Sequence, residues 1–121
     1  MDSSAKTKVG NSYWYILQNM PGSMQDPPTE SEQGAFLEFL EASSLVYPCR
    51  TCRPGFEWVR IHPPVFVSRS TLEQWICDFH NTVNAHLGHA QFNCATLKTE
   101  SCSTCEIVVP QVQKSEFAQL L

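Results

Sequence analysis

Long apolar runs and clusters of basic residues are both missing from this sequence. No stretch approaches the roughly 20 consecutive apolar residues that a membrane-spanning helix requires. Residues 1–10 are polar and lack the apolar core of a signal peptide. Basic residues number 8 against 12 acidic ones, which gives a net charge of -4. We therefore expect a soluble chain, not secreted through a signal peptide, that binds neither a membrane nor nucleic acid.

Strand signals are scarce as well, because no alternation of apolar and polar residues extends beyond a few positions. Thr29 with Glu32 and Ser70 with Glu73 form capping-box sequences, and each precedes apolar residues at helical spacing. The 121 residues suit one domain, for which we predict an all-α fold. The predicted helices cover residues 11–20, 30–46, a stretch between 48 and 61, 70–87 and a short segment at 94–97. Residues 1–9 are predicted to be disordered, residues 10–98 to form the domain and residues 99–121 to form a flexible tail.

The helix predicted at residues 70–87 has two different faces. Its apolar face consists of Leu72, Trp75, Ile76, Phe79, Val83 and Leu87. The other flank carries Cys77, His80, Asn81 and Asn84 on adjoining turns. An imidazole and two amides beside a sulfur suit a planar polar ligand that is held by stacking and by several hydrogen bonds.

Six cysteines stand out in a chain without a signal peptide, since thiols inside cells are usually kept reduced. They form two C-x-x-C pairs, Cys49/Cys52 and Cys102/Cys105, and a separated pair, Cys77 and Cys94. Cys49 follows Pro48, which is typical of the first turn of a helix. A helix N-terminus stabilises a thiolate, and the charge of Arg50 adds to this effect, so Cys49/Cys52 suits redox chemistry.

Two alternatives to redox chemistry stay open at this point. The two C-x-x-C pairs could share a zinc ion, although 49 residues separate Cys52 from Cys102, whereas common zinc ribbons have about 15–20. A thioredoxin-like motif would need a βαβ context, which the sequence lacks. Cys77 and Cys94 could be two buried free cysteines, but we favour a bridge between them, which would stabilise the fold by about 3 kcal/mol.

Three blocks of the sequence resemble the Erv/ALR family of FAD-dependent sulfhydryl oxidases. Residues 75–94, WICDFHNTVNAHLGHAQFNC, are similar to the family signature W-x-C-x-x-H-N-x-V-N-x-x-L-G-K-x-x-F-x-C. Residues 47–52, YPCRTC, resemble Y-P-C-x-x-C, and residues 10–18 resemble G-R-x-x-W-x-x-L-H. The blocks follow the family's order and cover most of residues 10–98. The short length tilts the resemblance towards a viral member.

The resemblance implies a four-helix bundle with a short fifth helix, a bound FAD and a homodimer. It implies that Cys52 faces the flavin, that Cys49 is the exposed sulfur attacked by substrate thiols, and that Cys77 and Cys94 form a structural disulfide. No metal is expected. The residues that would bind FAD are Gly10, Asn11, Trp14, Gln18, Cys77, His80, Asn81, Asn84, Gly88 and His89. Three of them depart from the family pattern, namely Asn11, Gln18 and His89 in place of Arg, His and Lys, and this predicts an altered affinity for FAD.

The resemblance also implies an activity. Electrons would pass from protein dithiol substrates or a thioredoxin-like carrier to Cys102/Cys105 on a mobile arm, then to Cys49/Cys52, FAD and O2, with H2O2 as the product. We expect a cytoplasmic location, in the host cytoplasm or virion of a virus, with the mitochondrial intermembrane space as the alternative. The competing functions are a zinc-stapled helical interaction module and a helical binding protein that has lost the cofactor.

Overall fold

The computed structural model describes residues 1–96 as a bundle of four α-helices. The helices are α1 (Ser3–Asn19), α2 (Glu30–Val46), α3 (Glu57–Ile61) and α4 (Arg69–Leu87), and the 3₁₀ helices are η1 (Pro21–Ser23) and η2 (Arg50–Phe56). No strand occurs in this part of the chain, so the predicted all-α fold is confirmed. None of the helices in residues 1–96 has the length and apolar character needed to cross a membrane.

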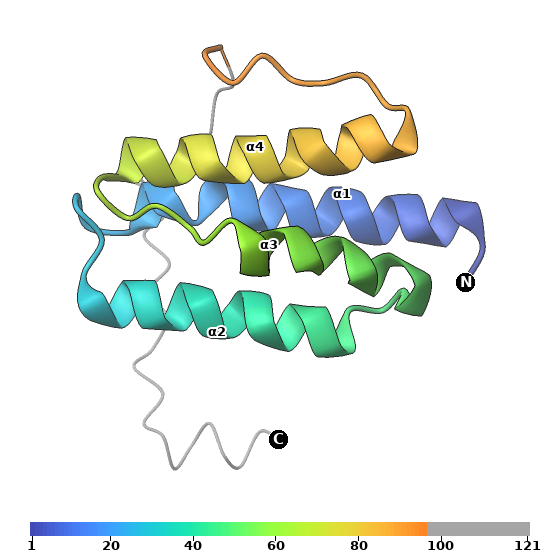
Figure 1. The fold of residues 1–121 in the computed structure, drawn as a ribbon, viewed down its shortest axis with the longest axis horizontal. Helices are drawn as coiled ribbons and strands as arrows, with labels where there is room; N and C mark the ends of the chain where they lie inside the picture. Colours follow the sequence, from blue (N-terminus) through green and yellow to red (C-terminus); the bar gives the residue numbers. More distant parts are fainter. Residues whose placement is uncertain (97–121) are drawn as a thin grey trace, which may run out of the picture.

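Helices α1 and α4 lie side by side and antiparallel, with α2 and α3 on the other side of α1 in the view of Figure 1. This arrangement brings the N-terminal half of α1, η2 and the C-terminal end of α4 to the same end of the bundle. After Gly88 the chain turns back and runs along the outer side of α4. Residues 88–96 therefore lie along α4.

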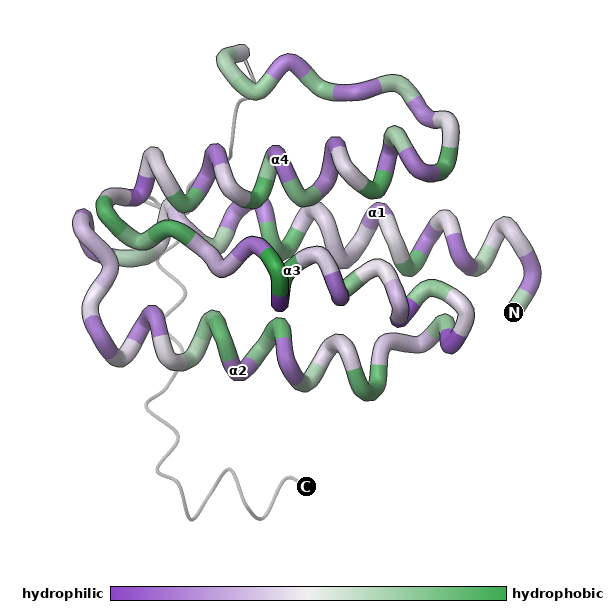
Figure 2. Tube along the Cα trace, in the orientation of Figure 1, coloured by the Kyte–Doolittle hydropathy of each residue, from purple (hydrophilic) through white to green (hydrophobic). Residues whose placement is uncertain are grey.

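The core forms where the apolar faces of α1, α2 and α4 meet. It consists of Leu17, Phe36, Leu40, Leu72, Trp75, Ile76 and Phe79. Figure 2 shows apolar positions of α4 towards the bundle and hydrophilic positions on its outer side. Leu87 was expected on the apolar face of its helix but is 59% exposed, and Leu45 of α2 is 68% exposed. Both lie in the last turns of their helices, where the apolar face extends beyond the packed region.

The start of α2 is as predicted, whereas the start of α4 is not. Thr29 Oγ1 accepts from the Glu32 amide, and the Glu32 carboxylate accepts from the Thr29 amide. In α4 the reciprocal pair is Ser68 and Thr71, two residues before the predicted Ser70 and Glu73. The Thr71 hydroxyl accepts from the Ser68 amide, as a Glu side chain does in the usual capping box, so a capping-box pattern that requires Glu or Gln does not include this pair.

The prediction of a disordered segment at residues 1–9 is wrong. Helix α1 begins at Ser3, and Asp2 caps it by accepting from the Ala5 amide at 2.8 Å. Ser12, near the start of the helix predicted at residues 11–20, lies inside α1 and donates its hydroxyl to the Lys8 carbonyl. The apolar pattern of α1 begins only near Tyr13, so burial does not explain why the first half of this helix forms. That half is stabilised by the Asp2 cap, by side-chain contacts in its first turns and by its continuity with the packed second half of α1.

A short helix at residues 94–97 is also not found in the described chain. Residues 94–96 form a turn, in which the Thr96 amide donates to the Asn93 carbonyl at 3.1 Å. Residues from 97 onwards, including the whole predicted tail, lie outside the described residues.

Candidate redox site

Cys49 and Cys52 form a disulfide at the start of η2, with their Cα atoms 5.3 Å apart. Cys49 is the N-cap residue of η2, and the Cys52 amide donates to the Cys49 carbonyl. Arg53 fixes this segment against α2, since its Nε donates to the Tyr47 carbonyl at 2.8 Å. The predicted position of Cys49 beside a helix N-terminus is confirmed, although that helix is of the 3₁₀ type.

The exposure of the two sulfurs differs from the prediction. Cys49 was expected to be the exposed sulfur, but it is only 3% exposed, whereas Cys52 is exposed. Cys49 lines a surface depression together with Lys6, Thr51 and Pro48. Because residues 1–9 are helical, α1 brings side chains over the disulfide that a disordered segment would not place there.

Aromatic rings connect the redox disulfide with the centre of the bundle. Phe56, at the end of η2, lies 5.8 Å from Tyr13, 5.6 Å from Tyr47 and 6.0 Å from Phe79 between ring centroids. Trp14 contacts Phe79 edge to face at 4.8 Å. Burial raises the pKa of Tyr13 to about 12, so this phenol is neutral at physiological pH.

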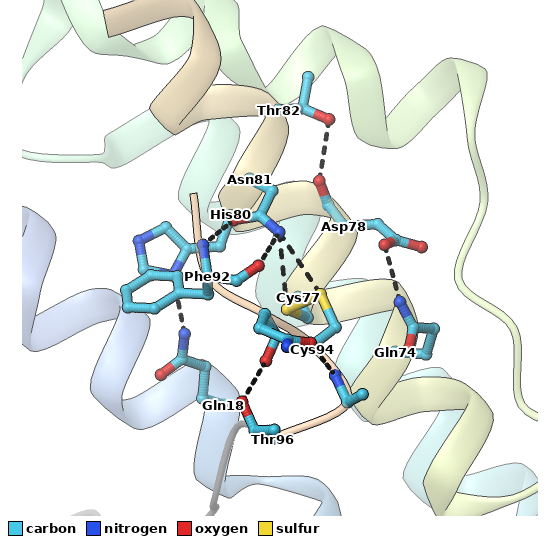
Figure 3. Close-up of a disulfide and its surroundings, with 12 residues drawn as sticks. Gln18, Gln74, Cys77, Asp78, His80, Asn81, Thr82, Phe92, Cys94 and Thr96 are labelled. Atoms are coloured by element: carbon cyan, nitrogen blue, oxygen red, sulfur yellow. Dashed lines mark hydrogen bonds between the residues drawn. A yellow bond between two sulfur atoms is a disulfide. The ribbon is translucent and has the colours of Figure 1, made fainter. Parts of the chain in front are cut away.

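The second disulfide joins Cys77 in α4 to Cys94 in the segment that runs back over this helix (Figure 3). It confirms the predicted bridge between these two cysteines. Asn81 lies one turn after Cys77, and its amide forms two hydrogen bonds with the backbone of Phe92, at 2.7 and 2.9 Å. The same amide nitrogen lies 3.4 Å from the Cys94 sulfur. Asn81 thus holds the returning segment at Phe92.

His80 is the centre of the second cluster. Its ring stacks on Trp14 at 4.2 Å with an angle of 10° between the planes, and it lies 4.6 Å from the Phe92 ring on its other side. The amide of Gln18 donates to His80 Nδ1 at 2.7 Å (Figure 3). Because Nδ1 accepts this bond, the proton of the neutral ring is on Nε2. Gln18 therefore selects a tautomer in which Nε2 is a donor.

Burial lowers the pKa of His80 to about 4. We expect acidification from about pH 6.5 towards pH 4 to destabilise the fold through this residue, because the unfolded chain binds a proton in this range and the folded chain does not. Above about pH 6.5 the ring is neutral in both states, so the stabilisation is fully present.

The prediction is checked by urea denaturation at about pH 7 and about pH 4.5. The free energy of unfolding of the wild-type chain should fall more between these two pH values than that of His80→Gln. The variant His86→Gln, at an exposed position of the same helix, should keep the wild-type difference. An equal fall in the free energy of unfolding between the two pH values for wild type and His80→Gln would contradict the prediction.

The other predicted site residues lie on α1, on α4 or directly after α4. Asn84 is buried one turn after His80, and its carbonyl accepts from the His89 amide at 2.8 Å. Gly88 has φ 73° and ends α4 in the left-handed conformation, which explains the glycine without a ligand. The other three are Gly10, which is half-buried, and Asn11 and His89, which are exposed. The structure thus brings Trp14, Gln18 and His80 together, while Cys102 and Cys105 lie outside the described residues.

Two features of the site were absent from the sequence prediction. Phe92 covers one face of His80, and Lys6 with Thr51 lies beside Cys49. Phe92 could have been identified from its place in the motif that ends at Cys94. Lys6 could not, because the segment that contains it was predicted to be disordered.

Known proteins share both the sequence pattern and this geometry. A sequence model described as the Erv1/Alr family matches residues 11–103. The chain belongs to the Erv1/Alr family.

Among curated relatives, the mitochondrial FAD-linked sulfhydryl oxidase ERV1 of Saccharomyces cerevisiae is 35% identical over 88 residues, which are 72% of this chain and 47% of the relative. The FAD-linked sulfhydryl oxidase ERV1 of Arabidopsis thaliana is 33% identical over 90 residues, 74% and 47% of the two chains. The chain spans about half the length of these Erv1/Alr relatives.

Solved structures of the Erv1/Alr family have the same fold. The FAD binding domain of Erv1 from Saccharomyces cerevisiae superposes with a TM-score of 0.70 at 32% identity, covering 78% of this chain and 89% of that domain. The yeast Erv1 core gives a TM-score of 0.69 at 32% identity, with 78% and 79% coverage. The helical bundle that carries the two disulfides of this chain therefore has the Erv1/Alr fold.

The residues of this Erv1/Alr chain fit a flavin nucleotide. His80 offers a neutral Nε2–H donor, and Trp14 and Phe92 offer flat apolar surfaces beside it. Planar heteroaromatic ligands are bound by such a combination of stacking and directed hydrogen bonds.

Proposed function

We propose that this chain is an FAD-linked thiol oxidase that converts dithiols to disulfides, with the stoichiometry 2 R-SH + O2 to R-S-S-R + H2O2. The observation that supports it most directly is the closed Cys49–Cys52 disulfide, which lies on η2 next to the aromatic cluster around Tyr13 and Phe56. A disulfide is an electrophile for incoming thiolates.

Two exchange steps would transfer the electrons to this disulfide. A substrate thiolate attacks one sulfur, the S–S bond breaks, and the other sulfur leaves as a thiolate. The second substrate thiolate then attacks the mixed disulfide, so that the substrate leaves oxidised and Cys49 and Cys52 are both reduced. The depression that Cys49 lines gives a substrate sulfur a route to it, and Cys52 would face the cofactor as the resemblance implies.

FAD, when bound, supplies a two-electron acceptor that can pass its electrons to O2. The residues that would hold it are Trp14 and His80. Gln18 fixes the tautomer of His80, and Asn81 with the Cys77–Cys94 disulfide fixes Phe92. Asn11 would contribute from the middle of α1, and Asn84, Gly88 and His89 would contribute from the C-terminal end of α4.

The substrates in this proposal are protein dithiols or a thioredoxin-like carrier, and Cys102/Cys105 would act as the shuttle pair. The active form would be a homodimer, for which exposed apolar side chains such as Ile16 of α1 and Leu37 of α2 offer contact area. The cytoplasmic location stays a prediction. Two yeast relatives are named mitochondrial, which supports the intermembrane space as the alternative.

The absorbance spectrum of the purified protein tests the function. We expect a flavin spectrum that bleaches when a dithiol is added under nitrogen and returns in air, with H2O2 released in proportion to the dithiol consumed. A colourless protein that contains zinc bound by four thiolates would instead support the interaction module. A colourless protein without zinc would contradict the oxidase and leave an Erv1/Alr fold that serves only binding.

A further inference from the structure

Three polar groups from two elements meet at the buried sulfur of the redox disulfide. The Lys6 ammonium of α1 donates to Thr51 Oγ1 at 3.3 Å, and the same oxygen lies 3.3 Å from Cys49 Sγ. Lys6 and Thr51 are separated by 45 positions in the sequence, and the helical conformation of residues 3–9 brings them together. Lys6, Thr51 and Cys49 line the same depression.

The charged side chains that line the depression are all cationic. Arg50 of η2 and Lys6 of α1 line the depression, and none of the residues that line it is acidic. Tyr47 lies two residues before Cys49 at the end of α2, and burial raises its pKa, so its phenol is neutral. A negative charge on Cys49 therefore has cations beside it, and only one of them, Lys6, reaches it through a hydrogen bond to a shared neighbour.

The hydroxyl of Thr51 connects the two groups in a defined direction. Because the Lys6 ammonium occupies a lone pair of Oγ1, the hydroxyl hydrogen is directed away from Lys6, and Cys49 Sγ is the acceptor within reach. A hydrogen bond to the charged form of an acid lowers its pKa, as does a nearby opposite charge. Both effects favour the thiolate of Cys49 once the disulfide is reduced.

We propose that Lys6 is a positioning residue for Cys49, which orients the Thr51 hydroxyl towards the sulfur and thereby stabilises the Cys49 thiolate. The catalytic consequence rests on the proposed function. Whichever sulfur the substrate attacks first, Cys49 leaves as a thiolate once in each oxidation of a dithiol. Stabilising that thiolate makes it a better leaving group, because a thiol of lower pKa leaves faster.

The proposal is tested by the pH dependence of Cys49 alkylation in the full-length, FAD-containing Cys52→Ser chain, where Cys49 is a free thiol. Iodoacetamide labelling is followed by mass spectrometry of the peptide that contains Cys49, so other thiols do not interfere. Lys6→Met should raise the midpoint by about half a pH unit and slow labelling at neutral pH about threefold. Lys6→Arg should restore the wild-type midpoint, and Lys8→Met, on the same helix, should leave it unchanged.

Salt and a second variant separate this role from a structural one. Because Lys6 is exposed, about 1 M NaCl should remove most of the difference between Lys6→Met and its parent. Thr51→Val should raise the midpoint by about one unit, and adding Lys6→Met to it should cause a smaller further shift than Lys6→Met causes alone. An unchanged midpoint in Lys6→Met, or an equal shift in Lys8→Met, would overturn the proposal. The measurement needs no turnover, so a failure of the oxidase function would appear separately, as the absence of dithiol oxidation in the wild-type chain.

Discussion

Cys52→Ser is expected to lower the rate of dithiol oxidation by at least about a thousandfold while the protein keeps its bound flavin. Serine cannot form the disulfide that accepts electrons, so no exchange reaction can begin at η2. The side chain of Cys52 is exposed and takes no part in the core, and serine differs from cysteine by one atom, so the fold should be retained. Oxygen consumption with dithiothreitol and the absorbance of the protein-bound flavin measure the two effects on one sample.

Cys49→Ser should cause the same loss, because either sulfur alone is insufficient. Lys8→Met, in the exposed part of α1, provides the matched control that should keep the wild-type rate. Turnover that persists in Cys52→Ser would show that another cysteine pair accepts the electrons and would remove Cys49/Cys52 from the proposed role. Loss of turnover together with loss of flavin would show instead that the change acts on the cofactor.

The helical elements could be predicted where their signals are local. The capping box at Thr29 and Glu32 fixes the start of α2 within four residues of sequence, and the structure has it there. The start of α4 uses Thr71 in place of Glu, which follows the same physics with a side chain that the pattern does not include. The N-terminal half of α1 lacks an apolar stripe, so its helical state depends on the Asp2 cap and on its continuity with the packed half.

The residues of the candidate site could be predicted from the sequence, but the exposure of Cys49 and Cys52 could not. Cys49/Cys52, Cys77/Cys94 and His80 were identified from spacing and from resemblance, and the structure forms both disulfides in residues 1–96. Which sulfur of the redox pair is shielded depends on residues more than 40 positions away, as the contact of Lys6 with Thr51 shows. The bond between Gln18 and His80 spans 62 positions. Such contacts arise only when helices pack, and no periodicity within one helix encodes them.

Removing the Cys77–Cys94 disulfide is expected to have the largest effect on stability. The bridge closes a loop with a sequence separation of 17, and the chain-entropy model gives about 3 kcal/mol for a loop of this size. Cys49–Cys52 closes a separation of only 3, for which the same model gives about 2 kcal/mol. Chemical denaturation of Cys77→Ala/Cys94→Ala and of Cys49→Ala/Cys52→Ala should therefore show the greater loss in the first variant. A loss in the first variant no greater than in the second would contradict the assignment of Cys77–Cys94 as the structural bridge.

The same variant should also weaken flavin binding, because the disulfide supports the segment that places Phe92 on His80. Asn81 alone would then hold this segment through its two bonds to the Phe92 backbone. Flavin release into the filtrate of an ultrafiltration experiment should increase for Cys77→Ala/Cys94→Ala at a denaturant concentration where the fold is intact by circular dichroism. Asn81→Ala in the disulfide-bonded chain should release flavin to a smaller extent, since the covalent bridge remains. If neither variant released more flavin than the wild type, the segment from 88 to 96 would have no part in holding the cofactor, and Phe92 would serve only to cover His80.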